Sequence, residues 1–409
     1  MIRYPPCPNL PPGAARHNGV FVPFSHLKSA QVYQPLGRKE TLQMPTPPIA
    51  KQQLLSVTAL CGELSPLAAS RLIPSQSYRY RVLEELAKAK LLHPYRRDQV
   101  KGHRLTRRAK NLLTEQTPER YAALFTGSVR TNGYTSELSR RLRMHRLGEV
   151  LAMMQLGDVA IFPDEKPNLF GSRIPPAASP CSAFYLAREI QSMGDIALKI
   201  KNARMAGVLL APSHFYLVYN TGNTLMRWAP ASELRARTLL TEYIGRRIGH
   251  PAYAGQNAEA LLLCEDLSLA PALFQSHGGG KRQLFFLDGT FDHMHLLSNN
   301  AQGDVLFQIL RKPGTSSAFN TALAGTLRPK RQIGNFAFDA LDEAGRPVLF
   351  AWDFDLVRIQ SFYSGLCGRE LTGTVIAFDF QVAALQQCLG EKAEIRPLSL
   401  ERTRRMLLP

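Results

Sequence analysis

The chain has 409 residues, 45% of them hydrophobic, and a formal net charge of +18 at pH 7. Its length and apolar content predict two or three domains with cores of their own. No apolar run approaches the roughly 20 residues of a membrane helix, and the stretch MIRYPPCPNLPPG lacks the hydrophobic segment of a signal peptide. We therefore expect a cytoplasmic protein without a membrane partner. The six single cysteines argue against both a disulfide framework and a zinc module.

Positive charge is concentrated in the first half of the chain. Residues 1–204 carry 30 Lys and Arg against 14 Asp and Glu, whereas residues 205–409 carry 20 against 18. This asymmetry predicts an anionic partner for the first half, either nucleic acid or an acidic membrane surface. The alternative is a solvated basic face that serves only solubility.

Composition divides the chain into four segments. Residues 1–48 are rich in proline and lack apolar periodicity, which predicts a disordered arm. Residues 49–116 carry the start and stop signals of several helices and form a compact module. Residues 117–180 combine a basic helix with a proline-rich linker, DEKPNLFGSRIPPAASP. Residues 181–409 alternate strand-like and helix-like runs, which is typical of an α/β domain.

Three helices are predicted at the start of the second segment. IAKQQLLSVTALC has apolar residues at helical spacing and ends at Gly62, and SPLAASRLI begins with Ser65 as N-cap and Pro66 at the first helical position. The third helix begins near Ser75. Its apolar face consists of Val82, Leu83, Leu86 and Ala89.

A basic hairpin is predicted after the third helix. Residues 91–95 form a strand, RRDQVKG a turn and residues 103–105 the returning strand, and Thr106 caps a further helix, RRAKNLL. Three helices followed by a basic hairpin is the order of a winged helix, whose third helix enters the major groove while the hairpin follows the neighbouring backbone. Residues 49–116 are therefore predicted to form a winged helix-turn-helix DNA-binding domain.

Polar and basic side chains of this region are the predicted contacts to double-stranded DNA. Cations supply affinity for phosphates, and the third helix could read base edges. The basic helix after residue 137 lies either along the phosphates or between domains with a solvated rim. The predicted contacts are Gln76, Ser77, Tyr80, Arg81 and Lys88, then Arg96, Arg97, Lys101 and Arg104, then Arg107 and Arg108, and finally Arg140 and Arg141.

Several of these stretches resemble one known family. QQLLSVTALCGELS, SYRYRVLEELAKAKLL, GHRLT, RLRMHRLGEVLAMM and RMAGVLLAPSHFYLVYNTG are together similar to the replication-relaxation family of plasmids and integrative conjugative elements, over residues 50–240. The resemblance implies a winged helix followed by an α/β region. It also implies a role in plasmid or conjugative-element replication, relaxation or mobilisation, with relaxase or replication proteins as partners. The arm and the residues after about 250 have no counterpart in it.

Carboxylates follow several strand-like runs of the last segment, at Glu265, Asp266, Asp288, Asp353, Asp355 and Asp379. Asp288, Asp353 and Asp355 could converge on Mg²⁺ in a restriction-endonuclease-like fold. The carboxylate-x-Lys ending of such a site is missing, because Val357 and Arg358 follow Asp355. Acids at strand ends are also ordinary cap and turn residues. A degenerate or purely structural α/β domain is therefore preferred.

The motif FDHMHLL places His293 and His295 on one strand face, as metal ligands can be, but no partner cluster is visible and a structural role is preferred. The sequence thus predicts an α+β or α/β protein that recognises DNA without catalysis, cofactor or metal. Two alternatives remain open. One is a metal-dependent nuclease guided by the winged helix, which convergence of the three aspartates would favour. The other is a scaffold whose winged helix docks a protein.

Overall fold

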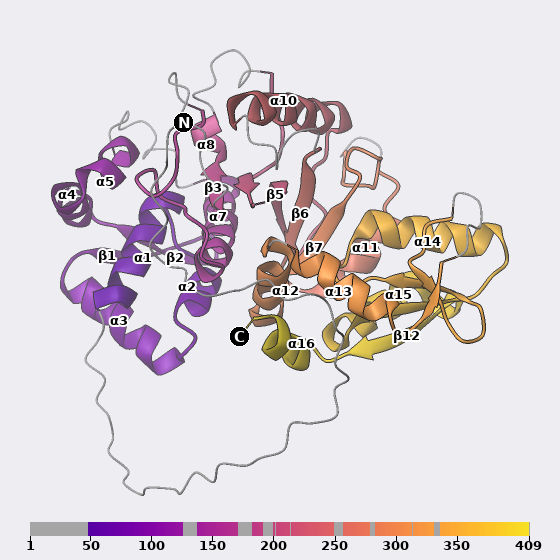
Figure 1. Ribbon diagram of the computed structural model, residues 1–409. Helices are drawn as coiled ribbons and strands as arrows, with labels where there is room; N and C mark the ends of the chain where they lie inside the picture. Colours follow the sequence, from indigo (N-terminus) through magenta and orange to yellow (C-terminus); the bar gives the residue numbers. More distant parts are fainter. Residues whose placement is uncertain are drawn as a thin grey trace, which may run out of the picture. The chain divides into compact units, whose positions relative to one another are not determined.

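The computed structural model describes residues 48–125, 137–170, 182–190, 199–200, 202–212, 214–248, 257–278, 283–312, 314–330 and 336–408. The predicted disordered arm therefore lies outside the described residues except for its last residue, and so does most of the predicted linker. The described residues combine helices with mixed β-sheets, which confirms the predicted α and β class (Figure 1). Among the described helices, none has the length and apolarity to cross a bilayer.

Three helices open the described chain: α1 (Pro48–Cys61), α2 (Pro66–Leu72) and α3 (Gln76–Lys88). Gly62 ends α1 with φ +88°, a conformation that favours glycine. The Ser65 hydroxyl accepts a hydrogen bond from the Ala68 amide at 3.0 Å, and Pro66 follows it, so the predicted N-cap of α2 is confirmed.

An antiparallel hairpin of β1 (Leu92–Arg97) and β2 (Val100–Leu105) follows α3. Its loop has only two residues, Asp98 and Gln99, with φ of 52° and 62°. Positive φ at both loop positions is the type I′ geometry that matches the twist of the flanking strands. The strands are therefore longer than predicted, because most of RRDQVKG is paired. Thr106 caps α4 (Arg107–Gln116) as predicted, and α5 (Pro118–Phe125) follows.

The basic helix, α7 (Leu138–Leu156), lies between this amino-terminal module and a β-sheet. It packs against α1 and α2 on one side and β5 on another. Its buried positions include Arg141 and His145 as well as apolar residues. These contacts join α7 to both the module and the sheet, and its placement along DNA phosphates stays a prediction.

The first sheet has five strands in chain order. They are β3 (Ala183–Leu186), β4 (Gly207–Leu210), β5 (Phe215–Gly222), β6 (Glu259–Cys264) and β7 (Met294–Ser298). The first three are antiparallel, and β6 and β7 run parallel to β5. The short helix α8 (Ala187–Ile190) follows β3, α10 (Pro230–Ile248) links β5 to β6, and η3 (Leu267–Leu269) with α11 (Ala270–Gln275) links β6 to β7.

Helices α12 (Ala301–Arg311) and α13 (Thr315–Ala324) lead into a second five-stranded sheet. Its strands are β8 (Arg328–Pro329), β9 (Ala340–Leu341), β10 (Pro347–Phe350), β11 (Gly373–Phe378) and β12 (Ala393–Leu398). The connections are α14 (Leu356–Gly368) before β11, and η5 (Asp379–Gln381), α15 (Val382–Leu389) and η6 (Gly390–Lys392) before β12. Helix α16 (Leu400–Leu407) follows β12.

The two sheets share one topology. In each, three antiparallel strands are followed by a helix and by two strands parallel to the third, and the strands lie in chain order across the sheet. A 3₁₀ turn and a short helix join the fourth strand to the fifth in both sheets, and another helix follows the fifth. This agreement in order, direction and connection indicates that the chain from β3 to α16 contains two copies of one structural unit.

The first sheet and strands β9 to β11 of the second are buried on both faces, which explains their nearly continuous apolar sequences, whereas β8 is exposed and β12 is only partly buried. Alternate residues of β6 belong to different cores: Leu261 and Leu263 belong to the core that also contains residues of α7, α12 and α13, whereas Leu262 belongs to the core that contains residues of α10, α11, α14 and α15. Each fully buried leucine contributes about 1.5–3 kcal/mol relative to exposure. The two cores therefore fix the register of β6, because a slip by one residue would exchange its faces.

Candidate functional site

Helix α3 presents a polar face to solvent. Val82 and Leu86 are buried, and the predicted DNA contacts Gln76, Ser77, Tyr80, Arg81 and Lys88 are all exposed. The Tyr80 side chain stands out because 62% of this large residue is exposed.

Arg79, which is half-buried on α3, has a local role. Its guanidinium donates to the carbonyl oxygens of Ile73 and Pro74 at 2.8 and 3.3 Å. It therefore ties the start of α3 to the preceding turn.

The hairpin tip is also exposed and basic. Arg96, Arg97 and Lys101 are exposed. The Nε atom of Arg97 lies 3.6 Å from Oδ2 of Asp98. Among the described residues, Arg96 and Lys101 have no ion-pair partner. Two more exposed arginines, Arg107 and Arg108, begin α4. Together with the polar face of α3 these residues form what we call the basic face.

Two predicted DNA contacts are instead structural. Glu63 is completely buried, and its carboxylate accepts hydrogen bonds from Arg141 Nη2 at 2.7 Å, Arg104 Nε at 2.7 Å and His145 Nε2 at 2.9 Å. The Arg141 side chain is 0% exposed and cannot reach a phosphate. Arg104 is largely buried, with its guanidinium 3.6 Å from the centre of the Tyr95 ring. The prediction for Arg141 is wrong because its guanidinium is buried in an ion pair with Glu63. Arg104 also forms an ion pair with Glu63.

Arg141 also donates hydrogen bonds to the backbone of the hairpin. Its Nη1 donates to the Arg97 carbonyl at 2.6 Å and its Nη2 to the Val100 carbonyl at 2.9 Å. Gly102 lets the hairpin lie close to Glu63 and His145, because a Cβ at this position would lie 2.7 Å from Glu63 Cγ and 2.8 Å from His145 Nε2. The Glu63 cluster therefore joins the α1–α2 loop, the hairpin and α7. Arg140, also on α7, is half-buried.

Burial opposes the charge of Glu63, but the hydrogen bonds from His145, Arg141 and Arg104 outweigh it and lower the pKa of Glu63 to about 2. A carboxyl group with a lowered pKa stabilises the fold fully above its ordinary value of 4.5 and loses that contribution as the pH falls toward 2.

We therefore expect acid to destabilise the wild-type chain more than its Glu63→Gln variant. The variant lacks the titrating group, so it should be the less stable protein at neutral pH and lose less stability between pH 4.5 and about 2. Urea midpoints measured across this interval test the expectation. Parallel pH profiles for the two proteins would contradict it.

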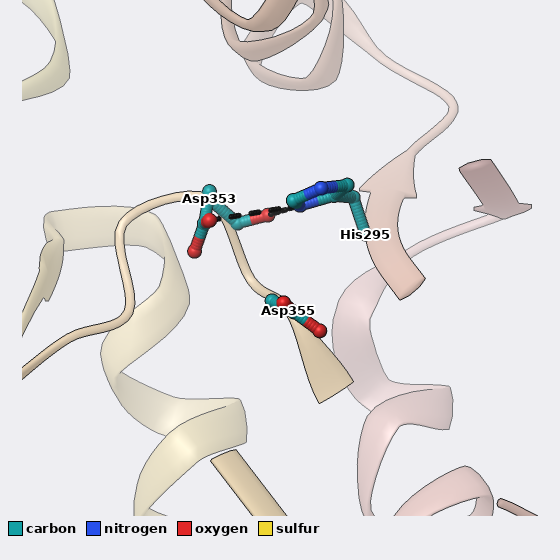
Figure 2. A group of neighbouring side chains, drawn as sticks. All are labelled: His295, Asp353 and Asp355. Carbon is teal, nitrogen blue, oxygen red and sulfur yellow. Dashed lines mark hydrogen bonds and ion pairs between the residues drawn. The ribbon is translucent and has the colours of Figure 1, made fainter. Parts of the chain in front are cut away.

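A second polar cluster lies where the two sheets meet, between β7 and the connection from β10 to α14. His295 of β7 forms an antiparallel bridge with Asp355, and the Leu296 amide donates to the Phe354 carbonyl at 3.0 Å. Phe354 is buried with φ +48°, an unfavourable conformation for a bulky residue. The bend at Phe354 places Asp353 and Asp355 against β7. Figure 2 shows Asp353 facing His295, with Asp355 below them in this view.

The His295 ring lies between two carboxylates. Its Nδ1 is 3.2 Å from the Asp353 carbonyl oxygen and 3.7 Å from Asp353 Oδ2, and its Nε2 is 3.3 Å from Glu259 Oε2. His214 stands on the other side of Glu259, with Nδ1 3.3 Å from Oε1. Imidazole rings and carboxylates therefore alternate through the cluster, from His214 just before β5 to Asp353 after β10.

The two aspartates are held differently. Asp355 caps α14: its Oδ1 accepts from the amides of Met294 and Val357, both at 3.1 Å, and its Oδ2 lies 2.6 Å from His293 Nδ1. Asp353 Oδ1 is buried and accepts no hydrogen bond from any described residue.

The neighbouring Arg358 does not donate a hydrogen bond to the Asp353 carboxylate. It forms two 2.7 Å hydrogen bonds to Asp339, and its Nη1 lies 3.9 Å from Asp353 Oδ2. Arg358 is therefore committed mainly to Asp339.

The pKa values of the histidine and the acids in this cluster are shifted from their ordinary values. Burial opposes the imidazolium, but the hydrogen bond to Glu259 and the charges of Asp353 and Asp355 raise the pKa of His295 to about 9. Burial raises the pKa of Asp353. It acts the same way on Asp355, where the hydrogen bond to His293 prevails and lowers the pKa. The pKa of Glu259 is likewise lowered, since hydrogen bonds with His214 and His295 outweigh burial.

The three aspartates proposed for the nuclease alternative do not converge. Asp353 and Asp355 lie together with His295, and one potential ligand atom from each lies within 4.8 Å of the others. Asp288 instead accepts from Trp228 Nε1 at 2.8 Å and from the Thr290 amide at 2.9 Å, as a turn residue does. The sequence showed two histidines on one strand face and proposed that Asp353 and Asp355 lie together, but it did not show that these acids of the other unit meet His295.

Comparisons with protein-family models, with curated proteins and with solved structures found no match to this chain.

Proposed function

We propose that this protein binds double-stranded DNA through its amino-terminal module, which we infer to be a winged helix. In this arrangement α3 enters the major groove and the hairpin follows the flanking backbone. The observation that supports the proposal best is the basic face: its cations are exposed beside an exposed tyrosine, while the opposite side of the same helix is buried.

The hairpin and α3 have different roles in this proposal. Arg96, Arg97 and Lys101 would neutralise phosphates, which supplies affinity without sequence information. Tyr80 and Arg81 stand on the part of α3 that would face base edges, where arginine can donate two hydrogen bonds to guanine. Arg104 and Arg141 are left out, because both serve the Glu63 carboxylate.

The biological setting that we propose rests on the resemblance to the replication-relaxation family. The protein would act as a DNA-binding accessory factor of a mobile genetic element, in replication, relaxation or mobilisation, and would meet a relaxase or a replication protein. We propose recognition without cleavage, because Asp288 lies apart from Asp353 and Asp355. A degenerate restriction-endonuclease-like fold for the α/β region remains part of the proposal.

Removing the hairpin cations should weaken binding to any duplex. For Arg96→Ala/Arg97→Ala/Lys101→Ala we expect the slope of log K against log salt to become shallower by about 0.9 per lost contact, up to about 2.7. Fluorescence anisotropy with a random duplex at several salt concentrations measures the slope.

The matched control removes three exposed arginines of α16, in the variant Arg402→Ala/Arg404→Ala/Arg405→Ala. It changes the net charge equally and should leave the slope close to that of the wild type. Equal slopes for the two triple variants would place the hairpin outside the interface. Absence of duplex binding by the wild-type chain would favour the protein-docking alternative.

A further inference from the structure

We propose that His295, Asp353 and Asp355 form a binding site for one first-row transition-metal dication of the Zn²⁺ or Mn²⁺ type. The site would lie between the last strand of the first unit and the β10–α14 connection of the second (Figure 2). It is separate from the basic face, and the proposal does not depend on DNA binding.

Asp353 provides the first reason. The residue is 9% exposed, its Oδ1 has no hydrogen-bond partner among the described residues, and its Oδ2 has only ionic neighbours, at 3.7 and 3.9 Å. Burying a carboxylate without hydrogen bonds is costly, and such groups are normally paired or coordinate a metal. Arg358 does not compensate Asp353, because it forms its short bonds to Asp339.

The surrounding hydrogen bonds provide the second reason. His295 presents Nδ1 toward Asp353, while its Nε2 faces Glu259 at 3.3 Å. Ligating histidines characteristically donate their other ring nitrogen to a carboxylate, which fixes the ring and increases its basicity. Asp355 is oriented in the same manner, by backbone amides on Oδ1 and by His293 at its Oδ2.

The ligand atoms are already close together but would have to move inward. Three ligand atoms with bonds of about 2.0–2.2 Å to one ion lie about 3.3–3.8 Å apart, whereas the three candidate atoms lie within 4.8 Å of one another. A movement of each atom by up to about 0.7 Å would close the site around an ion.

The residue types select the class of ion. Mg²⁺ and Ca²⁺ prefer oxygen ligands, whereas imidazole suits transition metals. One imidazole with two carboxylates therefore favours Zn²⁺ or Mn²⁺ over Mg²⁺. Two carboxylates would also balance the charge of a dication.

The test measures metal binding by the full-length, untagged chain after removal of metal. Titration with Mn²⁺, followed by the electron paramagnetic resonance signal of the free ion, should show one bound ion per chain, and calorimetry with Zn²⁺ should show the same stoichiometry. Since loss of a supporting partner typically costs about 10- to 100-fold in affinity, Asp353→Asn should cost more than that. Mg²⁺ should bind far more weakly.

Asp379→Asn is the control, because it removes an exposed aspartate that follows a strand of the same sheet. It should bind the ion as the wild type does. The melting temperature of Asp353→Asn without metal serves as its own reference, and only the wild type should gain thermal stability from Mn²⁺. His295→Gln supplies a second ligand variant. Absence of saturable binding, undiminished binding by Asp353→Asn, or equal affinity for Mg²⁺ would each overturn the proposal.

Discussion

Replacing Arg141 with methionine is expected to destabilise the amino-terminal module by about 3–5 kcal/mol, the usual cost of breaking a buried ion pair from one side. Methionine fills part of the same volume but donates no hydrogen bond. Glu63 would lose one of its three partners, and the carbonyl groups of Arg97 and Val100 would each lose the hydrogen bond from Arg141. Urea denaturation at neutral pH measures the loss, and hydrogen exchange of β1 and β2 shows whether the hairpin loosens.

Arg143→Met is the matched control, because Arg143 lies on the same helix and is exposed. Among the described residues it has no ion-pair partner, so its replacement should change stability by no more than about 0.5 kcal/mol. If the two variants unfold at the same urea concentration, the Glu63 cluster does not support the module. Replacing Glu63 and Arg141 together should cost less than the sum of the single changes, because they are in direct contact.

The Arg141 variant also separates two ways in which an arginine can affect DNA binding. A residue that only holds the hairpin lowers affinity through stability and leaves the number of phosphate contacts unchanged. The salt slope of folded Arg141→Met should therefore match that of the wild type, whereas the hairpin triple variant should have a shallower slope.

The sequence was most informative where local chemistry decides structure. Ser65 and Thr106 were predicted as N-caps, and both accept the expected amide hydrogen bonds. The exposed side of α3 was also predicted, since its helical periodicity separates Val82 and Leu86 from Tyr80 and Arg81. These features depend on a few neighbouring residues, so they are visible in the chain itself.

Ion pairs between residues far apart in the chain could not be predicted from the sequence. Arg141 and Arg143 look equivalent in SRRLRMHR, but one is buried and the other exposed, because Glu63 lies 78 residues before Arg141 in the chain. A partial signal existed, since Arg141, His145 and Gly148 lie on one side of the helix at spacings of four and three residues. Charge on that side indicates a buried partner, but its identity requires the fold.

The metal site shows the same limit. Asp353 and Asp355 are two residues apart and would share one side of a regular strand, but nothing in the sequence shows that this side meets β7. The bend at Phe354, which has a positive φ, brings both aspartates against His295. The repetition of the structural unit leaves a trace in the sequence, because ALLLCEDLSLAPALF and TVIAFDFQVAALQQC each contain an apolar strand followed by an acid and a short helix. It would not have revealed that the two units meet at His295.

Specificity provides the last expected result, because the proposal assigns base reading to α3 and not to the hairpin. Arg81→Ala and Tyr80→Ala should each cost about 1–3 kcal/mol on a preferred duplex, selected beforehand from a random library, and should change binding to unselected DNA only slightly. Both side chains are exposed, and Arg81 lies beside the Tyr78 ring at 5.2 Å, so their removal leaves the core of the module intact. Competition between selected and random duplexes measures the discrimination.

Arg107→Ala is the contrasting variant. Loss of a phosphate contact at the start of α4 should weaken binding to both duplexes equally and make the salt slope shallower by about 0.9. If Arg81→Ala behaves as Arg107→Ala does, α3 only positions the module and any sequence preference arises elsewhere.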